Sequence, residues 1–276
     1  MPDGRLAGKV ILVAGATGMA AAGAERFAVE GARVFVTSRT TADIEALVSR
    51  IGSSSGQVAA RAADLQEERD VERVFTALLD RFGRLDGLFH VAGGSGRRFG
   101  DGPVHEATLE GWERTIRLNL TTQFLVLRGA LRQLLAQPAR RAGRGSIVLL
   151  GSITSVHPSP ERFATHAYAA AKAGVNGLVA AASAYYAPVG IRVNAVAPGL
   201  VRTPMSARAQ ADPLVQEAAA RRQPLVGAFI EPDDVVPAVV YLLSDESRAV
   251  TGQVLGVDAG WSVADGSGWA GPPASA

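Results

Sequence analysis

The sequence contains no cysteine, which excludes a disulfide framework, a zinc–thiolate site and a thiol nucleophile. Neither sign of charge predominates, because 28 Lys and Arg stand against 26 Asp and Glu, and a net charge of +2 is too small for a nucleic-acid-binding face. No apolar run reaches the length of a membrane span, and Met1 to Lys9 lacks the apolar core of a secretory signal. These absences favour a cytoplasmic protein that binds neither nucleic acid nor membrane.

Histidine is also scarce. The four histidines, His90, His105, His157 and His166, lack the i, i+4 pairing by which a helix presents two imidazoles to a zinc ion. We therefore expect no metal site.

Seven short runs rich in Val, Ile and Leu lie along the chain, and most intervals between them could hold a helix. Without polar alternation, such runs are typical of strands buried on both faces of a parallel sheet. We predict an α/β fold of 1–276 as one doubly wound domain of Rossmann type, with a seven-stranded parallel sheet and helices on both faces. The expected strands are Lys9–Ala14, Arg33–Thr37, Gln57–Ala62, Gly87–Val91, Ser146–Leu150, Ile191–Val196 and Gln253–Val257.

Helical spacing of apolar residues predicts a helix that includes 71–82 and stops at Gly83, and a longer one over about Leu109–Leu135. Thr40 and Asp43 could form a capping box for a helix at Asp43–Ile51.

A loop containing Gly15 and Gly18 follows the first strand and opens a helix. Glycines here permit a tight turn and let N–H groups approach a pyrophosphate, although an ordinary strand-to-helix turn has the same appearance. The second strand runs into Ser38 and Arg39, where an acidic residue would bind a ribose 2′-hydroxyl and an arginine favours a 2′-phosphate. If a dinucleotide binds, we therefore favour NADP(H) over NAD(H).

Tyr168 and Lys172 are four residues apart and so share one helix face. A free phenol has a pKa of about 10, and a nearby cation would lower it toward the range that proton exchange with a carbonyl oxygen needs. Ser152 follows a buried strand, at the sheet edge where ligands collect in open α/β folds. Each feature alone has a structural explanation, namely a chance helix pair and a turn cap.

Taken together, the motifs resemble the single-domain branch of the short-chain dehydrogenase/reductase family over about residues 6–263. The matching pieces occur in the family's order: the Gly15 loop, Asp64, His90-Val91-Ala92-Gly93, Asn119, Ser152, Tyr168 with Lys172, Pro198-Gly199 with Thr203, and Thr251-Gly252-Gln253 with Asp258.

The resemblance implies four catalytic roles. Tyr168 would exchange the proton with the substrate oxygen, and Ser152 would orient that oxygen. Lys172 would bind the nicotinamide ribose and lower the pKa of Tyr168, and Asn119 would hold a water that links Lys172 to solvent. The implied cofactor contacts are Gly15, Thr17, Gly18, Met19, Ser38, Arg39, Asp64, Leu65, Ala92, Gly93, Tyr168, Lys172, Pro198, Gly199, Val201 and Thr203.

Three departures from the family pattern bear on these expectations. The glycine loop is one residue short, and Ala20 stands at its last glycine, where a methyl group could crowd the phosphates. His90-Val91 replaces a pair of asparagines that mainly tie strands together, which affects stability more than chemistry. Ser152 and Tyr168 are sixteen positions apart, about three more than is typical of the family.

The sequence therefore predicts an NADP(H)-dependent oxidoreductase that interconverts a small-molecule ketone or aldehyde and an alcohol. The alternative is a member of the same fold family with altered or lost redox activity, such as a non-redox biosynthetic enzyme or a binding protein. Residues 202–226 resemble the family's substrate lid. We expect 264–276 to be a flexible tail, parts of which Trp261 and Trp269 could anchor on a neighbour. The apolar outer face of the helix at His166–Tyr186 predicts a homo-oligomer, and the family resemblance implies a tetramer before a dimer.

Overall fold

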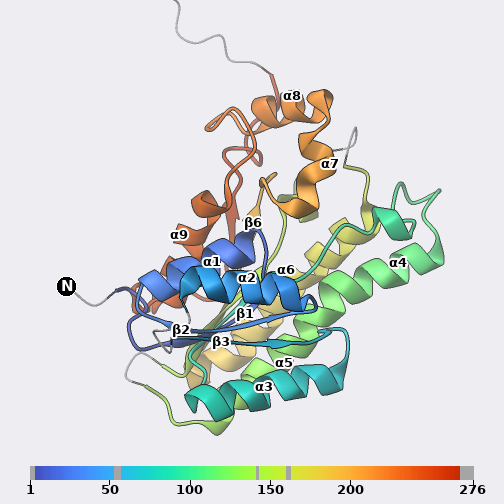
Figure 1. Ribbon diagram of the computed structural model, residues 1–276. Helices are drawn as coiled ribbons and strands as arrows, with labels where there is room; N and C mark the ends of the chain where they lie inside the picture. The colour runs from blue at the N-terminus through green and yellow to red at the C-terminus, as the bar shows by residue number, and fades with distance from the viewer. Residues whose placement is uncertain (1–3, 53–56, 141–142, 160–162, 268–276) are drawn as a thin grey trace, which may run out of the picture.

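The computed structural model describes residues 4–52, 57–140, 143–159 and 163–267 (Figure 1). Its seven strands form one sheet in the order β3-β2-β1-β4-β5-β6-β7, and every neighbouring pair is parallel. The predicted sheet is confirmed, with each strand end within about two residues of its expected place. The strands are β1 Val10–Ala14, β2 Arg33–Ser38, β3 Val58–Ala62, β4 Gly87–His90, β5 Gly145–Leu150, β6 Ile191–Pro198 and β7 Val254–Val257.

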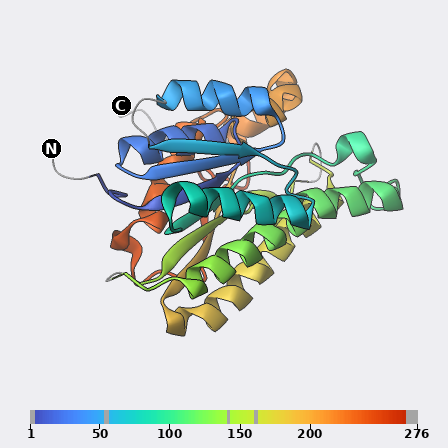
Figure 2. The ribbon, with the colours of Figure 1, turned by 60° about the horizontal axis from the view of Figure 1, so that its bottom comes forward.

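Helices cover both faces of the sheet, as predicted, and Figure 2 shows the resulting three layers. One face packs against α1 Met19–Val29, α2 Thr41–Ile51 and α9 Pro232–Leu243. The other packs against α3 Glu68–Phe82, α5 Thr122–Ala136 and α6 His166–Tyr186. Three further helices, α4 Leu109–Ile116, α7 Ala207–Gln210 and α8 Pro213–Arg222, belong to the segments that follow β4 and β6.

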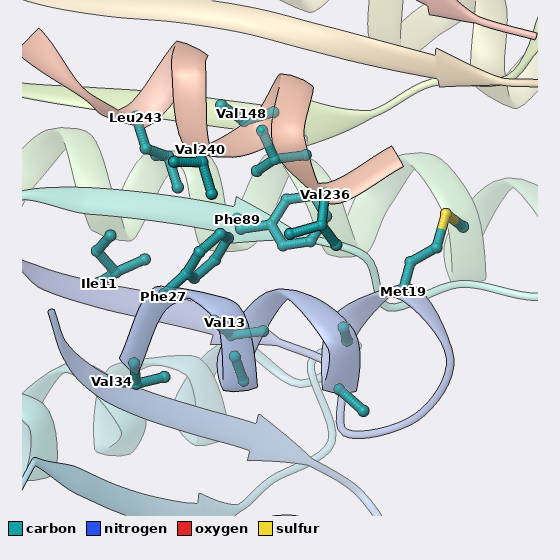
Figure 3. Close-up of a cluster of buried hydrophobic side chains, with 14 of the residues drawn as sticks. Ile11, Val13, Met19, Phe27, Val34, Phe89, Val148, Val236, Val240 and Leu243 are labelled. Atoms are coloured by element: carbon teal, nitrogen blue, oxygen red, sulfur yellow. The ribbon is translucent and has the colours of Figure 1, made fainter. Parts of the chain in front are cut away.

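The face under α1 and α9 shows why the apolar runs form a sheet (Figure 3). Successive strand residues point to opposite faces, so Ile11 and Val13 enter this core while Leu12 enters the other. Phe27 of α1 meets Phe89 of β4 edge to face, with ring centroids 5.8 Å apart. Each such buried side chain stabilises the fold by roughly 1.5–3 kcal/mol, so the sheet and its helices form together.

The long helix expected at Leu109–Leu135 is interrupted. A π-helical turn, Arg117–Thr121, separates α4 from α5 and holds Asn119. In a π turn each N–H bonds five residues back, so one extra residue is accommodated without changing the apolar pattern on either side.

The predicted capping box of α2 is wrong. The helix begins at Thr41, and the side chain of its N-cap residue, Thr40, makes no capping hydrogen bond among the described residues. The first main-chain bond of the helix runs from the Ile44 N–H to the Thr40 carbonyl at 3.2 Å. Asp43 contributes only its charge near the helix N-terminus.

The expectation that Trp261 anchors on a neighbour is also wrong. Its side chain is buried within its own chain, and its Nε1–H donates to the carbonyl of His157 at 3.1 Å. Trp269 and the end of the expected tail lie outside the described residues. Within the described ranges, no helix combines the length and the hydropathy that crossing a bilayer requires.

Candidate active site

Two adjoining cavities open at the carboxyl ends of the strands, and every predicted site residue lines at least one of them. Tyr168, Leu150, Met19, Thr203 and Met205 line both. The first, called here the cofactor-side cavity, holds Gly15, Thr17, Gly18, Met19, Ser38, Arg39, Asp64, Leu65, Ala92, Gly93, Asn119, Tyr168, Lys172 and Thr203. The second, called the substrate-side cavity, holds Ser152, Pro198, Gly199 and Val201 beside Tyr168.

The glycine loop has a backbone that only glycine adopts readily. Gly15 has φ +127° and Gly18 has φ +53°, and a Cβ at Gly18 would lie 2.9 Å from Cγ2 of Thr203. No described side chain caps α1, so the amides at its start face the cofactor-side cavity. The loop can therefore hold a phosphate group.

Ala20, which stands at the family's last glycine, is fully buried. A Cβ built at Gly15 would lie only 2.8 Å from the Ala20 methyl carbon. The methyl group therefore fills the space beneath Gly15, at the floor of the cavity.

At the far end of the cofactor-side cavity, Ser38 ends β2 and the exposed Arg39 follows it. On the other wall, Asp64 is held in a tight turn, since its Oδ1 accepts from the Gln66 N–H at 3.0 Å and its own N–H donates to Asp70 at 3.1 Å. One acidic side chain, Asp43, also lines this end. The charges of Arg39 and Asp43 thus face the same space.

Asn119 is fully buried, and its side-chain amide makes three hydrogen bonds. Its Oδ1 accepts from the Gly94 N–H at 3.0 Å, while Nδ2 donates to the carbonyls of Gly94 at 2.9 Å and Thr115 at 3.0 Å. The side chain ties the loop after β4 to the π turn. Because both Nδ2 hydrogens are used, a water between Asn119 and Lys172 would have to donate to an oxygen of Asn119.

Lys172 is 1% exposed, and its Nζ donates to the Leu150 carbonyl at the end of β5 at 2.8 Å. Nζ lies 5.6 Å from the ring centroid of Tyr168. Burial lowers the pKa of Lys172 to about 7, because the interior disfavours the ammonium form. The predicted pairing of Tyr168 with Lys172 on one helix face is therefore present.

Burial raises the pKa of Tyr168 to about 12, and the Ser152 side chain offsets part of the rise. The sequence led us to expect the opposite direction, a pKa lowered by Lys172. Lys172 does not produce that lowering here, because burial leaves its side chain largely uncharged at the pH where the phenol ionises. Ser152 is mostly buried, and its Oγ lies 2.9 Å from Oγ1 of Thr154.

Gln123 is a site residue that sequence reasoning missed. Its side chain is fully buried, and Nε2 donates to the Asn119 carbonyl at 3.1 Å and to the Leu150 carbonyl at 3.0 Å. One carboxamide thus joins the π turn to the strand end that holds Lys172. A glutamine in a helical pattern ordinarily indicates a solvent-facing position, so no signal in the sequence distinguished it.

Asp101 was also missed. It lies in the loop after β4, yet its carboxylate accepts from the main-chain N–H groups of Ala167 at 2.9 Å and Tyr168 at 3.1 Å. Asp101 therefore fixes the first turn of α6, which carries the phenol.

His90 is fully buried, and neither of its ring nitrogens has a hydrogen-bond partner in the described part of the chain. Burial, with the charge of Lys172 second, lowers its pKa to about 3. Oε1 of Gln123 is likewise buried without a partner among those residues. The imidazole is therefore neutral near pH 7.

The substrate-side cavity has an apolar wall built from Phe163, Leu200, Met205 and Trp261, and the rings of Phe163 and Trp261 pack edge to face at 5.8 Å. Its formal charges come from Arg97 and Arg208. The described ranges contain no cluster of three side chains that could hold a metal ion.

Comparisons with known proteins agree with this geometry. Residues 13–262 match the family model described as enoyl-(acyl carrier protein) reductase. A 3beta-hydroxysteroid dehydrogenase of Eggerthella lenta is 37% identical, covering 95% of this chain and 96% of that protein. A 2,5-dichloro-2,5-cyclohexadiene-1,4-diol dehydrogenase of Sphingobium indicum is 32% identical, covering 94% and 98%.

Solved structures give the same result. A short-chain dehydrogenase/reductase from Mycobacterium ulcerans superposes with a TM-score of 0.84 at 29% identity, covering 94% of this chain and 91% of that one. An actinorhodin polyketide ketoreductase solved with NADPH has a TM-score of 0.80 at 28% identity, covering 92% and 97%. The chain therefore belongs to the short-chain dehydrogenase/reductase family, whose members are oxidoreductases that act on alcohols and carbonyl compounds with nicotinamide cofactors.

Proposed function

We propose that the protein is an NADP(H)-dependent oxidoreductase that interconverts a ketone or aldehyde and an alcohol, with Tyr168 as the general acid and base. The observation that carries the proposal is the position of Tyr168, which lines both the cofactor-side and the substrate-side cavity. A phenol at this junction can reach an oxygen held by Ser152 while a nicotinamide lies on its other side.

The chain supplies the groups that such a reaction needs. The bound nicotinamide would provide or accept the hydride and, when oxidised, a positive charge. Tyr168, neutral because burial raises its pKa, is in the form that donates a proton during carbonyl reduction. Ser152 would orient the substrate oxygen, Lys172 would hold the ribose, and Asn119 would accept a hydrogen bond from a water through one of its oxygens.

The glycine loop, Asp64-Leu65 and Ala92-Gly93 would hold the rest of the dinucleotide, and Pro198 to Thr203 its nicotinamide end. The preference for NADP(H) rests on Arg39, which lines the far end of the cofactor-side cavity without an acidic residue at position 38 or 39. Titration of the protein's fluorescence with NADPH and NADH tests this choice. We expect the lower Kd for NADPH and a loss of that preference in Arg39→Ala.

The Tyr168→Phe variant tests the catalytic role. We expect turnover to disappear while the Kd for NADPH changes by less than about threefold, since the ring that lines the cavity remains. Tyr185→Phe is the matched control, because Tyr185 lies on the same helix but is 76% exposed, and it should keep wild-type activity. Full activity in Tyr168→Phe would refute the role. Binding of neither nucleotide below millimolar concentration would favour a non-redox member of the family.

We also propose that residues 202–226 act as the substrate lid within a single catalytic domain, since Met205, Ser206, Arg208 and Ala209 line the substrate-side cavity. The outer face of α6, which exposes Ala173, Gly177 and Ala180, fits a close contact with a second copy of the chain. A molar mass from light scattering four times that of the chain would support a homotetramer.

A further inference from the structure

We propose that the substrate carries a carboxylate, which Arg97 and Arg208 bind while its reacting oxygen lies at Ser152 and Tyr168. This inference rests on the proposed function and names the substrate class of the same site. It starts from two kinds of polar group that line the substrate-side cavity, the two guanidinium groups and the hydroxyls of Ser152 and Tyr168.

Both arginines line the substrate-side cavity, and they reach it from distant parts of the chain. Arg97 begins a short 3-10 turn, Arg97–Phe99, in the loop after β4, and Arg208 lies in α7 of the lid segment. Neither arginine lines the cofactor-side cavity. Their charges therefore face the substrate's space and not the predicted phosphate contacts of the cofactor.

These two guanidinium groups are the only formally charged side chains among the described residues that line the substrate-side cavity. They are close enough to repel one another, since Arg208, after burial, contributes to lowering the pKa of Arg97. Asp101 acts in the opposite sense and raises the pKa of Arg97, although its carboxylate, which caps the start of α6, does not line the cavity. A pair of like charges in a half-enclosed site favours an anion between them.

The remaining residues that line the cavity indicate what the rest of the substrate is like. Phe163, Leu200 and Trp261 add an apolar surface to the cavity that also holds the arginines and the hydroxyls of Ser152 and Tyr168. A keto or hydroxy acid with an apolar body satisfies all three regions. A planar guanidinium matches a carboxylate with two parallel hydrogen bonds, which makes Arg a strong selector for this group.

The test uses two ligands of nearly equal shape that need no turnover, cyclohexanecarboxylate and cyclohexanecarboxamide, titrated calorimetrically into the protein saturated with NADPH. We expect the carboxylate to bind about tenfold to a hundredfold more tightly than the uncharged amide. Its affinity should fall with added salt. Equal affinity for the two ligands, or binding of neither, would overturn the proposal.

Variants assign the effect to the two residues. Arg97→Gln and Arg208→Gln should each remove about tenfold of the carboxylate affinity and leave that of the amide unchanged. Arg98→Gln is the matched control, because Arg98 is exposed, lies 4.5 Å from the ring centroid of Phe99 and does not line the cavity. If Arg208→Gln weakens NADPH binding and spares the carboxylate, the arginine serves the cofactor and the proposal is wrong.

Failure of the inference and failure of the proposed function give different results. A redox-inactive protein would show no NADPH oxidation with any ketone yet could still prefer the carboxylate ligand. An active oxidoreductase without the anion site would oxidise NADPH and bind the two ligands equally.

Discussion

Asp101 accepts a hydrogen bond from the main-chain N–H of Tyr168 at 3.1 Å. The carboxylate thereby connects the loop after β4 to the residue that lies between the two cavities. Because it bonds to the backbone and not to the phenol, it can hold the position of Tyr168 without altering the ionisation of the ring.

Asp101→Ala removes this cap. We expect the free energy of unfolding to fall by about 0.5–2 kcal/mol. We also expect kcat to fall about tenfold or more, since small displacements of a reacting group are costly. Thr108→Ala is the control, because Thr108 caps α4 by accepting from the Gly111 N–H at 2.9 Å, and its loss should lower stability alone. Unchanged kcat in Asp101→Ala would contradict the positioning role.

Lys172 should make stability depend on pH above neutrality. The folded protein loses this proton near pH 7, whereas an unfolded lysine keeps it to about pH 10.4, so between these values the unfolded state binds more protons. Stability should therefore rise with pH from 7.5 to 9.5, and Lys172→Met should rise less in urea unfolding. Lys9→Met, which changes the partner of Asp245 at the surface, should parallel the wild type. Parallel curves for wild type and Lys172→Met would show that the ammonium is not desolvated.

His90 should make the stability of the protein depend on pH below neutrality. Its pKa is about 3 in the folded protein and about 6.5 when unfolded, so stability is fully present above pH 6.5 and falls as the pH is lowered toward 3. The slope from this one group approaches about 1.4 kcal/mol per pH unit. His90→Asn should flatten the dependence between pH 6.5 and 5 in denaturant titrations. His105→Asn, whose side chain is 80% exposed, should not. An unchanged slope in His90→Asn would mean that the imidazole is protonated where it lies.

Gly15→Ala should damage the cofactor-side cavity specifically. The new methyl group meets both an unfavourable φ of +127° and the Ala20 methyl carbon at 2.8 Å, so the loop must shift. We expect the Kd for NADPH to rise about tenfold or more. Gly8→Ala provides the comparison, since Gly8 also has a positive φ, +69°, but open space around it. It should cost about 1–2 kcal/mol of stability and leave the Kd unchanged. If Gly15→Ala binds NADPH with wild-type affinity, the glycine loop is not part of the cofactor-binding site.

The sheet could be predicted because its evidence is local. Runs such as 10–14 and 34–37 are continuously apolar or β-branched, and the stop at Gly83 was confirmed by its left-handed backbone. The positions of the site residues could be predicted because parallel strands all end at one edge of the sheet. The ionisation of these residues could not be predicted, since the direction in which the pKa of Tyr168 is shifted depends on burial, which the sequence spacing from Lys172 does not reveal.

The missed residues depend on tertiary contacts. Asp101 caps a helix 66 positions further along the chain, beyond the reach of any capping pattern. Gln123 is buried only because α5 lies against β5 at this point, and its pattern on the helix resembles that of an exposed polar residue. Arg208 approaches Arg97 through the fold of the segment that follows β6, which no local spacing encodes.

Because of the π turn at Arg117–Thr121, the geometry of the site depends on the number of residues in this segment. A helix advances about 100° for each residue, so deleting one position here would restore an ordinary helix and rotate everything on one side of the deletion by that angle. Asn119 would then swing away from Gly94, although every side chain named above would still be present in the sequence. A comparison of relatives by residue identity alone would miss such a loss, whereas a count of residues between Thr108 and Gln123 would reveal it.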